Sequence, residues 1–159
     1  MAVSPDVKAA LAGAHRDRAL IYRAMYHALR ARLGDAGAAE TMREALRSRG
    51  RAIGEGFRSH APDDLAWFAK AFVVDPPDSD LWDASVDRCG GALDMTMRHC
   101  PLKEAWQADG ADDAEVARLC FIASALDEGT FEAAGFDWSI ETWARGIEGC
   151  CRLHVRAKA

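Results

Sequence analysis

Residues 82–100 read WDASVDRCGGALDMTMRHC, a pattern typical of two paired β-strands. On both sides of Gly90-Gly91, apolar and polar side chains alternate with a period of two, which is the period of a strand. A Gly-Gly pair favours a tight hairpin turn, because glycine adopts positive φ angles without strain. The stretch therefore predicts antiparallel strands over 82–88 and 93–99.

The C-terminal part of the chain repeats this arrangement. Alternating residues predict two further strands, over 136–143 and 150–156, with Gly146 and Gly149 in the turn between them. We expect all four strands to form one antiparallel sheet.

Helices are predicted between the two strand pairs. Pro101 suits the first turn of a short helix that ends near Ala108. Asp112 and Asp113 can cap a longer helix over 114–131.

The first half of the chain has the 3.6-residue period of α-helices. One helix is predicted over 7–33 and ends at Gly34, a second lies over 36–57, and a third runs from Pro62 to Pro76. The first helix carries an apolar stripe that repeats every four residues, at Ile21, Met25 and Leu29.

Three glycines, Gly50, Gly54 and Gly56, are unexpected in the second helix, since glycine weakens a helix interior by about 1 kcal/mol relative to alanine. The helix could be kinked or frayed there. Alternatively, another backbone or a ligand could pass so close that a Cβ atom would not fit.

These elements indicate an α+β fold in one domain over 1–159, with a helical half over 1–75 and a sheet-containing half over 76–159. The second half has the element order ββ-αα-ββ. We expect its four-stranded antiparallel sheet to be covered by helices on one face.

The composition is that of a folded protein, because half of the 159 residues are hydrophobic and no low-complexity tract occurs. Charged residues interrupt the first 23 positions, and no uncharged run is long enough to cross a membrane. We therefore expect a cytoplasmic location with reduced thiols. The odd number of cysteines, five, also disfavours a disulfide framework.

Charge is unevenly distributed along the chain. Residues 1–60 carry 11 basic and 6 acidic side chains, whereas residues 61–159 carry 9 and 19. We expect the two halves to attract each other or a neighbouring subunit, and the second case would give a homodimer. The basic half has few aromatic residues and no run of Lys or Arg, which disfavours nucleic-acid binding.

Cys100 is the clearest candidate for chemistry. It follows a strand and directly precedes Pro101, so its thiol would lie at a helix N-terminus, where the dipole and free N–H groups lower a thiol pKa. His99 is a poor base for this thiol, because consecutive strand residues point to opposite faces. The alternative role of Cys100 is that of a small buried capping residue.

Cys120 and Asp127 lie seven residues apart on nearly the same face of the predicted helix 114–131. A buried cysteine is often only a small apolar residue, but an acid on an inner face needs a partner. Asp127 and Glu128 also lie near the predicted end of that helix, where the dipole disfavours acids. A function or an arginine partner is needed to explain them.

Cys150 and Cys151 are expected to begin the last strand and therefore to face opposite sides of the sheet. One thiol would join the core and the other would face Cys100 or solvent. Such thiols would suit zinc, copper(I) or an iron–sulfur cluster. The chain has no Cys-x-x-Cys pair, however, and we expect no metal and no cofactor.

Several of these residues occur in a pattern that resembles the L-2-amino-thiazoline-4-carboxylic acid hydrolase family. The pattern comprises Cys-Pro-Leu at 100–102, Leu-Cys at 119–120 and Trp-x-x-Gly-x-x-x-Cys-Cys-x-Leu at 143–153. In much of the family an acid follows the helix cysteine after two or three residues, whereas here the acid is Asp127.

The resemblance implies hydrolysis of a small cyclic amidine, in which an amino-thiazoline ring opens to a carbamoyl-cysteine. Cys100 would then be the nucleophile, and Asp127 or Glu128 the acid and base. The predicted catalytic site also includes Cys120 and Cys151. The predicted ligand contacts are His99, Glu128, Trp143 and an arginine for the carboxylate, Arg98 or Arg145.

Two other functions stay open. The cysteine pair of the final strand also resembles the four-vinyl-reductase-like domain, which would make the protein a small-molecule sensor or carrier. A third hypothesis is an interaction module whose Trp-rich acidic half packs on a protein partner. The partner expected from the first two functions is a small molecule, with no nucleic acid and no membrane.

Overall fold

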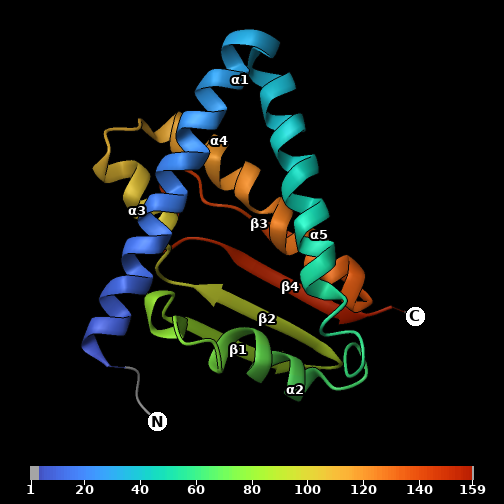
Figure 1. The fold of residues 1–159 in the computed structure, drawn as a ribbon. Helices are drawn as coiled ribbons and strands as arrows, with labels where there is room; N and C mark the ends of the chain where they lie inside the picture. Colours follow the sequence, from blue (N-terminus) through green and yellow to red (C-terminus); the bar gives the residue numbers. More distant parts are fainter. Residues whose placement is uncertain (1–3, 159) are drawn as a thin grey trace.

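Four strands form one antiparallel sheet in the computed structural model, which describes residues 4–158 (Figure 1). The strands follow one another across the sheet in the order β1-β2-β4-β3. Their bounds are β1 (Ala84–Cys89), β2 (Ala92–Met97), β3 (Phe136–Glu141) and β4 (Arg152–Ala157). The prediction of an α+β fold, with a helical N-terminal half followed by a four-stranded antiparallel sheet, is confirmed. The predicted domain ends, at 1 and 159, lie outside the described residues.

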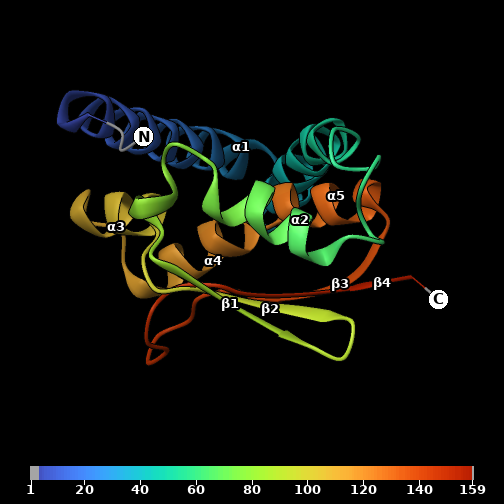
Figure 2. The ribbon, with the colours of Figure 1, turned by 90° about the horizontal axis from the view of Figure 1, so that it is seen from below.

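The helices lie on one face of the sheet (Figure 2). On that face Leu93 pairs with Val155 and Met95 with Leu153, and all four side chains are buried. The alternation of strand residues leaves polar side chains on the other face. There Asp94 and His154 approach each other to 2.5 Å.

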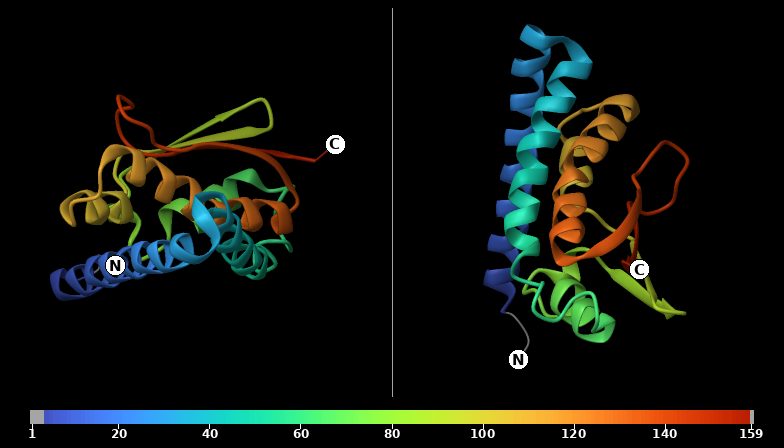
Figure 3. Two further views of the ribbon diagram at one scale, coloured as in Figure 1. Left: turned by 90° about the horizontal axis from the view of Figure 1, so that it is seen from above. Right: turned by 90° about the vertical axis from the view of Figure 1, so that its right-hand side faces the viewer.

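The first helix, α1 (Pro5–Gly54), is a helical hairpin that reverses at Gly34 (Figure 3). Gly34 has a φ of 74°, a conformation that glycine adopts without strain, and it lies where the sequence predicts a helix end. We call residues 5–33 the first arm and residues 35–54 the second arm.

The remaining helices are shorter. They are α2 (Leu65–Ala69), the π-helix η1 (Lys70–Val74), the 3₁₀-helix η2 (Ser79–Leu81), α3 (Pro101–Ala108), α4 (Asp113–Ala123) and α5 (Ala125–Ala134). Within residues 4–158, none of the helices has both the length and the apolar character needed to span a membrane.

Three predicted helix bounds are wrong, and one of them is the end of the second helix, which lies at Gly54 rather than at residue 57. The third helix begins at Leu65 rather than Pro62, because the Asp64 carboxylate caps it by accepting the Trp67 backbone N–H at 2.8 Å. The predicted helix 114–131 is interrupted at Ser124, which separates α4 from α5. The Ser124 hydroxyl donates to a backbone carbonyl of the preceding turn at 2.9 Å, a contact that tends to bend helices.

The buried face of the first arm differs from the apolar stripe that the sequence predicts. Ala19 is fully buried, whereas Ile21 and Met25 are each 50% exposed. Trp106 of α3 explains the difference, because its buried indole N–H donates to the Ala19 carbonyl at 2.7 Å. This hydrogen bond holds the Ala19 side of the helix against α3.

The second arm packs against α5 through glycines. A Cβ atom on Gly50 would overlap the Leu126 carbonyl, one on Gly54 would overlap the Thr130 carbonyl, and one on Gly129 would overlap the Arg47 carbonyl. The two backbones are therefore in direct contact. The close approach, and not a frayed helix end, is the reason for Gly50 and Gly54.

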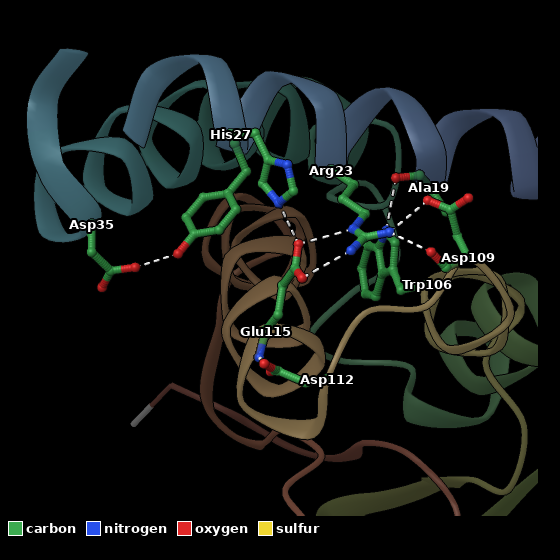
Figure 4. Close-up of polar contacts among 9 residues, drawn as sticks. Ala19, Arg23, His27, Asp35, Trp106, Asp109, Asp112 and Glu115 are labelled. Carbon is green, nitrogen blue, oxygen red and sulfur yellow. Dashed lines mark hydrogen bonds and ion pairs between the residues drawn. The ribbon is translucent and has the colours of Figure 1, made fainter. Parts of the chain in front are cut away.

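Ion pairs join the basic first half of the chain to the acidic second half. Arg23 binds both carboxylate oxygens of Glu115 at 2.9 and 3.0 Å and Asp109 at 2.6 Å (Figure 4). In the second arm, Arg43 lies 2.7 Å from Glu128. The opposite charges of the two halves therefore attract each other within the chain.

We predict that Gly50→Ala lowers the free energy of unfolding by about 2 kcal/mol or more, because the added methyl forces the second arm and α5 apart. Gly13→Ala is the matched control in α1, since a Cβ atom there meets nothing within 4 Å. That control should be stabilised by about 0.5–1 kcal/mol through helix propensity. Urea denaturation measures both changes, and equal stability of the two variants would contradict the predicted helix contact.

Candidate functional site

A cavity of about 260 Å³ lies between the first arm of α1, the helices α3 to α5 and the ends of β2 and β4. Four of the five cysteines line it, together with two acids, an arginine and several aromatic and aliphatic side chains. Its chemically active wall residues are His15, Arg18, Tyr22, Asp78, Cys100, Cys120, Asp127, Cys150 and Cys151.

All five cysteines are free. Cys150 and Cys151 both line the cavity, with their sulfur atoms 3.5 Å apart, so the prediction that they face opposite sides is wrong. They precede β4 instead of belonging to it, and strand alternation does not apply to them. Hydrogen bonds of 2.9 Å from Cys150 N–H to the Met97 carbonyl, and from Met97 N–H to the Cys151 carbonyl, hold this segment against the end of β2.

Cys100 is the N-cap of α3, as the sequence predicts. Its sulfur accepts the Lys103 backbone N–H at 3.5 Å. The neighbouring Cys150 thiol lowers the pKa of Cys100, the N–H groups of Leu102 and Lys103 act in the same direction, and burial opposes them.

The neighbouring sulfur atoms of Cys100, Cys120 and Cys151, together with burial, raise the pKa of Cys150. Of the Cys100 and Cys150 thiols, Cys100 has the lowered pKa and is therefore the one whose environment favours the thiolate. A thiolate is the nucleophilic form of cysteine.

Asp127 lines the same cavity from the first turn of α5. Burial raises the pKa of this carboxyl to about 7, while the nearby Arg18 acts in the opposite direction. Asp127 does not lie at a helix C-terminus, where the dipole would disfavour an acid, because the helix is interrupted at Ser124. That interruption makes Asp127 a residue of a helix N-terminus, where the dipole favours acids.

Arg18, which the sequence analysis did not select, faces Asp127 across the cavity wall from α1. Its Nη2 lies 2.9 Å from His15 Nδ1, and His15 Nε2 lies 2.6 Å from Asp78 Oδ2. The signal that could have found it is the helical spacing of His15, Arg18 and Tyr22, at i, i+3 and i+7.

The cavity wall does not include the five residues predicted as ligand contacts. Arg98 pairs with Asp83 at 3.3 Å, and Arg145 pairs with Asp113 at 3.3 Å. Both arginines are on the surface, with Arg145 86% exposed.

The other three lie in different surroundings. His99 is exposed and contacts Glu104 at 3.0 Å. Glu128 points the other way, toward Arg43 of the second arm, because it follows Asp127 by one helical step. Trp143 is buried in the core beside α3 and α4.

Cys89 lies in the exposed hairpin, away from the cavity. In the part of the chain that the structure describes, no group of three or more His, Cys, Asp or Glu residues is arranged to hold a metal ion. The cavity wall brings together thiols, carboxyl groups and a guanidinium around one small volume.

We predict that iodoacetamide alkylates Cys100 of the folded protein with an apparent pKa below the free-thiol value of about 8.5. Cys89 is the internal control, because it is exposed and should react with an ordinary pH dependence. Peptide mass spectrometry across a pH series measures both rates. Labelling of Cys100 after all other cysteines, at every pH, would contradict the thiolate assignment.

We predict that the Asp127 carboxyl destabilises the protein as the pH rises. Because the pKa of Asp127 is raised to about 7, its stabilising protonated form is complete below about pH 4 and is lost as the pH approaches 7. Wild-type protein should lose up to about 1.4 kcal/mol per pH unit from this group between pH 4 and 7, and Asp127→Asn should lack that slope. Urea denaturation at several pH values measures it, with Asp87→Asn on the exposed part of β1 as control. Parallel curves for wild type and Asp127→Asn would be the contrary result.

Comparison with known proteins agrees with the resemblance noted in the sequence. A search of curated proteins gives no match to the chain. The model of the L-2-amino-thiazoline-4-carboxylic acid hydrolase family matches residues 15–155, which include every chemically active residue of the cavity wall. The chain therefore belongs to the L-2-amino-thiazoline-4-carboxylic acid hydrolase family.

Proposed function

We propose that the protein hydrolyses a small cyclic amidine of the 2-amino-thiazoline type, with Cys100 as nucleophile and Asp127 as acid and base. The observation that carries the proposal is the meeting of a thiol of lowered pKa and a carboxyl that titrates near 7 in one cavity. Perturbed groups of this kind, gathered in a cavity, are typical of catalytic sites.

In the first step, the Cys100 thiolate attacks the ring carbon that lies between sulfur and nitrogen. The bond from this carbon to the ring sulfur breaks, and the Asp127 carboxyl gives its proton to the departing sulfur. The ring has then opened to a thiol, and the carbon is bound to Cys100 as an isothiourea.

In the second step, water attacks the same carbon. One proton of the water passes to the former ring nitrogen and the other to the Asp127 carboxylate, and Cys100 leaves as a thiolate. One water is consumed and a carbamoyl group is formed. An acid whose pKa is near the working pH can serve both steps, because its protonated and ionised forms have similar free energies at that pH.

The neighbouring thiols have a supporting role in this proposal. The Cys150 thiol lowers the pKa of Cys100 and so favours the thiolate before the attack. Cys120 and Cys151 raise the pKa of Cys150 and so help to keep it a thiol. A reducing compartment such as the cytoplasm is part of the proposal, because oxidation would remove the thiolate.

We predict that wild-type protein converts L-2-amino-thiazoline-4-carboxylate to a carbamoyl-cysteine, measured by liquid chromatography with mass detection. Cys100→Ser should lower kcat about 10³-fold or more, and Asp127→Asn about 10²- to 10⁴-fold. Cys89→Ser is the matched control and should keep full activity, since Cys89 is far from the cavity wall in the exposed hairpin.

Two results would contradict the hydrolase assignment. Full activity of Cys100→Ser would exclude the covalent route. Binding of the compound without turnover by wild-type protein would instead favour the sensor or carrier function.

A further inference from the structure

Arg18 has a donor that the protein leaves unused. Its Nε atom is buried and has no hydrogen-bond partner within residues 4–158. Arginine carries five N–H donors and no acceptor, and a buried donor without a partner is costly. Because Arg18 lines the cavity, an acceptor for this N–H can come from a ligand.

Contacts with His15, and through it with Asp78, fix the orientation of the Arg18 guanidinium. Arginine only donates, so the 2.9 Å contact from Arg18 Nη2 makes His15 Nδ1 the acceptor. His15 Nε2 then carries the proton and donates it to Asp78 at 2.6 Å. The Trp82 ring packs edge-on against His15, with 5.5 Å between ring centroids, and its indole N–H lies 3.4 Å from Asp78.

This chain of contacts leaves one edge of Arg18 for a ligand. Nη2 has two N–H groups, so one can bind His15 while the other, beside the Nε N–H, meets a ligand. Two parallel donors of this kind match the two oxygen atoms of a carboxylate. Other parts of the cavity wall are apolar, at Phe72, Met97 and Leu153. A volume of about 260 Å³ limits the ligand to a small molecule.

We propose that Arg18 binds the carboxylate of a small cyclic substrate through its Nε edge, and that Asp78 and His15 position it for this contact. The inference rests on the proposed function, because it takes the same cavity as the substrate site. It replaces Arg98 and Arg145, which are bound to Asp83 and Asp113 outside the cavity.

The assignment also suits the proposed chemistry. In a thiazoline-4-carboxylate, the carboxylate is attached to ring carbon 4, and the reacting carbon is ring carbon 2. The ring nitrogen lies between these two carbons. Arg18 belongs to α1, whereas Cys100 caps α3 and Asp127 belongs to α5. An acid held by α1 can therefore present its ring to groups on the other elements of the wall.

The test is calorimetric binding of two probes, thiazolidine-4-carboxylate and its neutral primary amide, neither of which has the amidine carbon. Wild-type protein should bind the acid at least tenfold more tightly than the amide. Arg18→Gln should weaken binding of the acid by ten- to a hundredfold and leave binding of the amide unchanged. Arg16→Gln, on the exposed side of the same helix, is the control and should keep the wild-type preference.

If Arg18→Gln fails to fold, Arg18→Lys decides, because it keeps the charge but loses the Nε donor. A preference reduced fivefold or more supports the inference, and an unchanged preference overturns it. Equal binding of the two probes by wild-type protein, or binding of neither, also overturns it.

The failures of the two proposals are distinguishable. A carboxylate preference that depends on Arg18, without hydrolysis of the amino-thiazoline, leaves the Arg18 site standing and removes the hydrolase. Hydrolysis with the same kcat/KM in wild type and Arg18→Gln removes the Arg18 site alone.

Discussion

The contact between the second arm of α1 and α5 is the constraint on which the site depends. Gly50, Gly54 and Gly129 let two helix backbones touch, and a single methyl group at any of them would overlap a carbonyl. The contact also fixes the rotation of α5. Gly129 faces α1, and Asp127, two residues earlier, is about 200° away around the helix, which directs it to the cavity.

The cavity holds three groups of different charge: the Cys100 thiol, the Asp127 carboxyl and the Arg18 guanidinium. The neighbouring Cys150 thiol and the N–H groups at the start of α3 lower the pKa of Cys100, while burial raises the pKa of Asp127 to about 7. Arg18 supplies the positive charge and is held by a neutral His15. The nucleophile Cys100, the acid Asp127 and the anion-binding Arg18 can therefore each act on a ligand in the same cavity.

Local patterns of the sequence predict the parts of the structure that depend on near neighbours. The alternation around Gly90-Gly91 identifies the β1–β2 hairpin, and the Pro101 that follows Cys100 identifies the capping of α3. The interruption of the helix at Ser124 has no such marker, since neither glycine nor proline accompanies it.

The residues that the sequence could not assign depend on distant partners. Arg18 becomes prominent only when His15 meets Asp78, which is 63 positions away along the chain. Arg98 and Arg145 are close in sequence to the cysteines, but surface acids bind them. The purpose of Gly50 and Gly54 likewise requires α5, about 80 positions further on, as the Thr130 hydrogen bond to Gly50 illustrates.

The central claim is that Cys100 and Asp127 face one ligand in one cavity. A crystal structure of the Cys100→Ser variant with bound L-2-amino-thiazoline-4-carboxylate tests it most directly. The account predicts the ligand inside the cavity between α1, α3 and α5, in contact with both residue 100 and Asp127. A ligand bound elsewhere, or a closed core that keeps residue 100 and Asp127 apart, would contradict it.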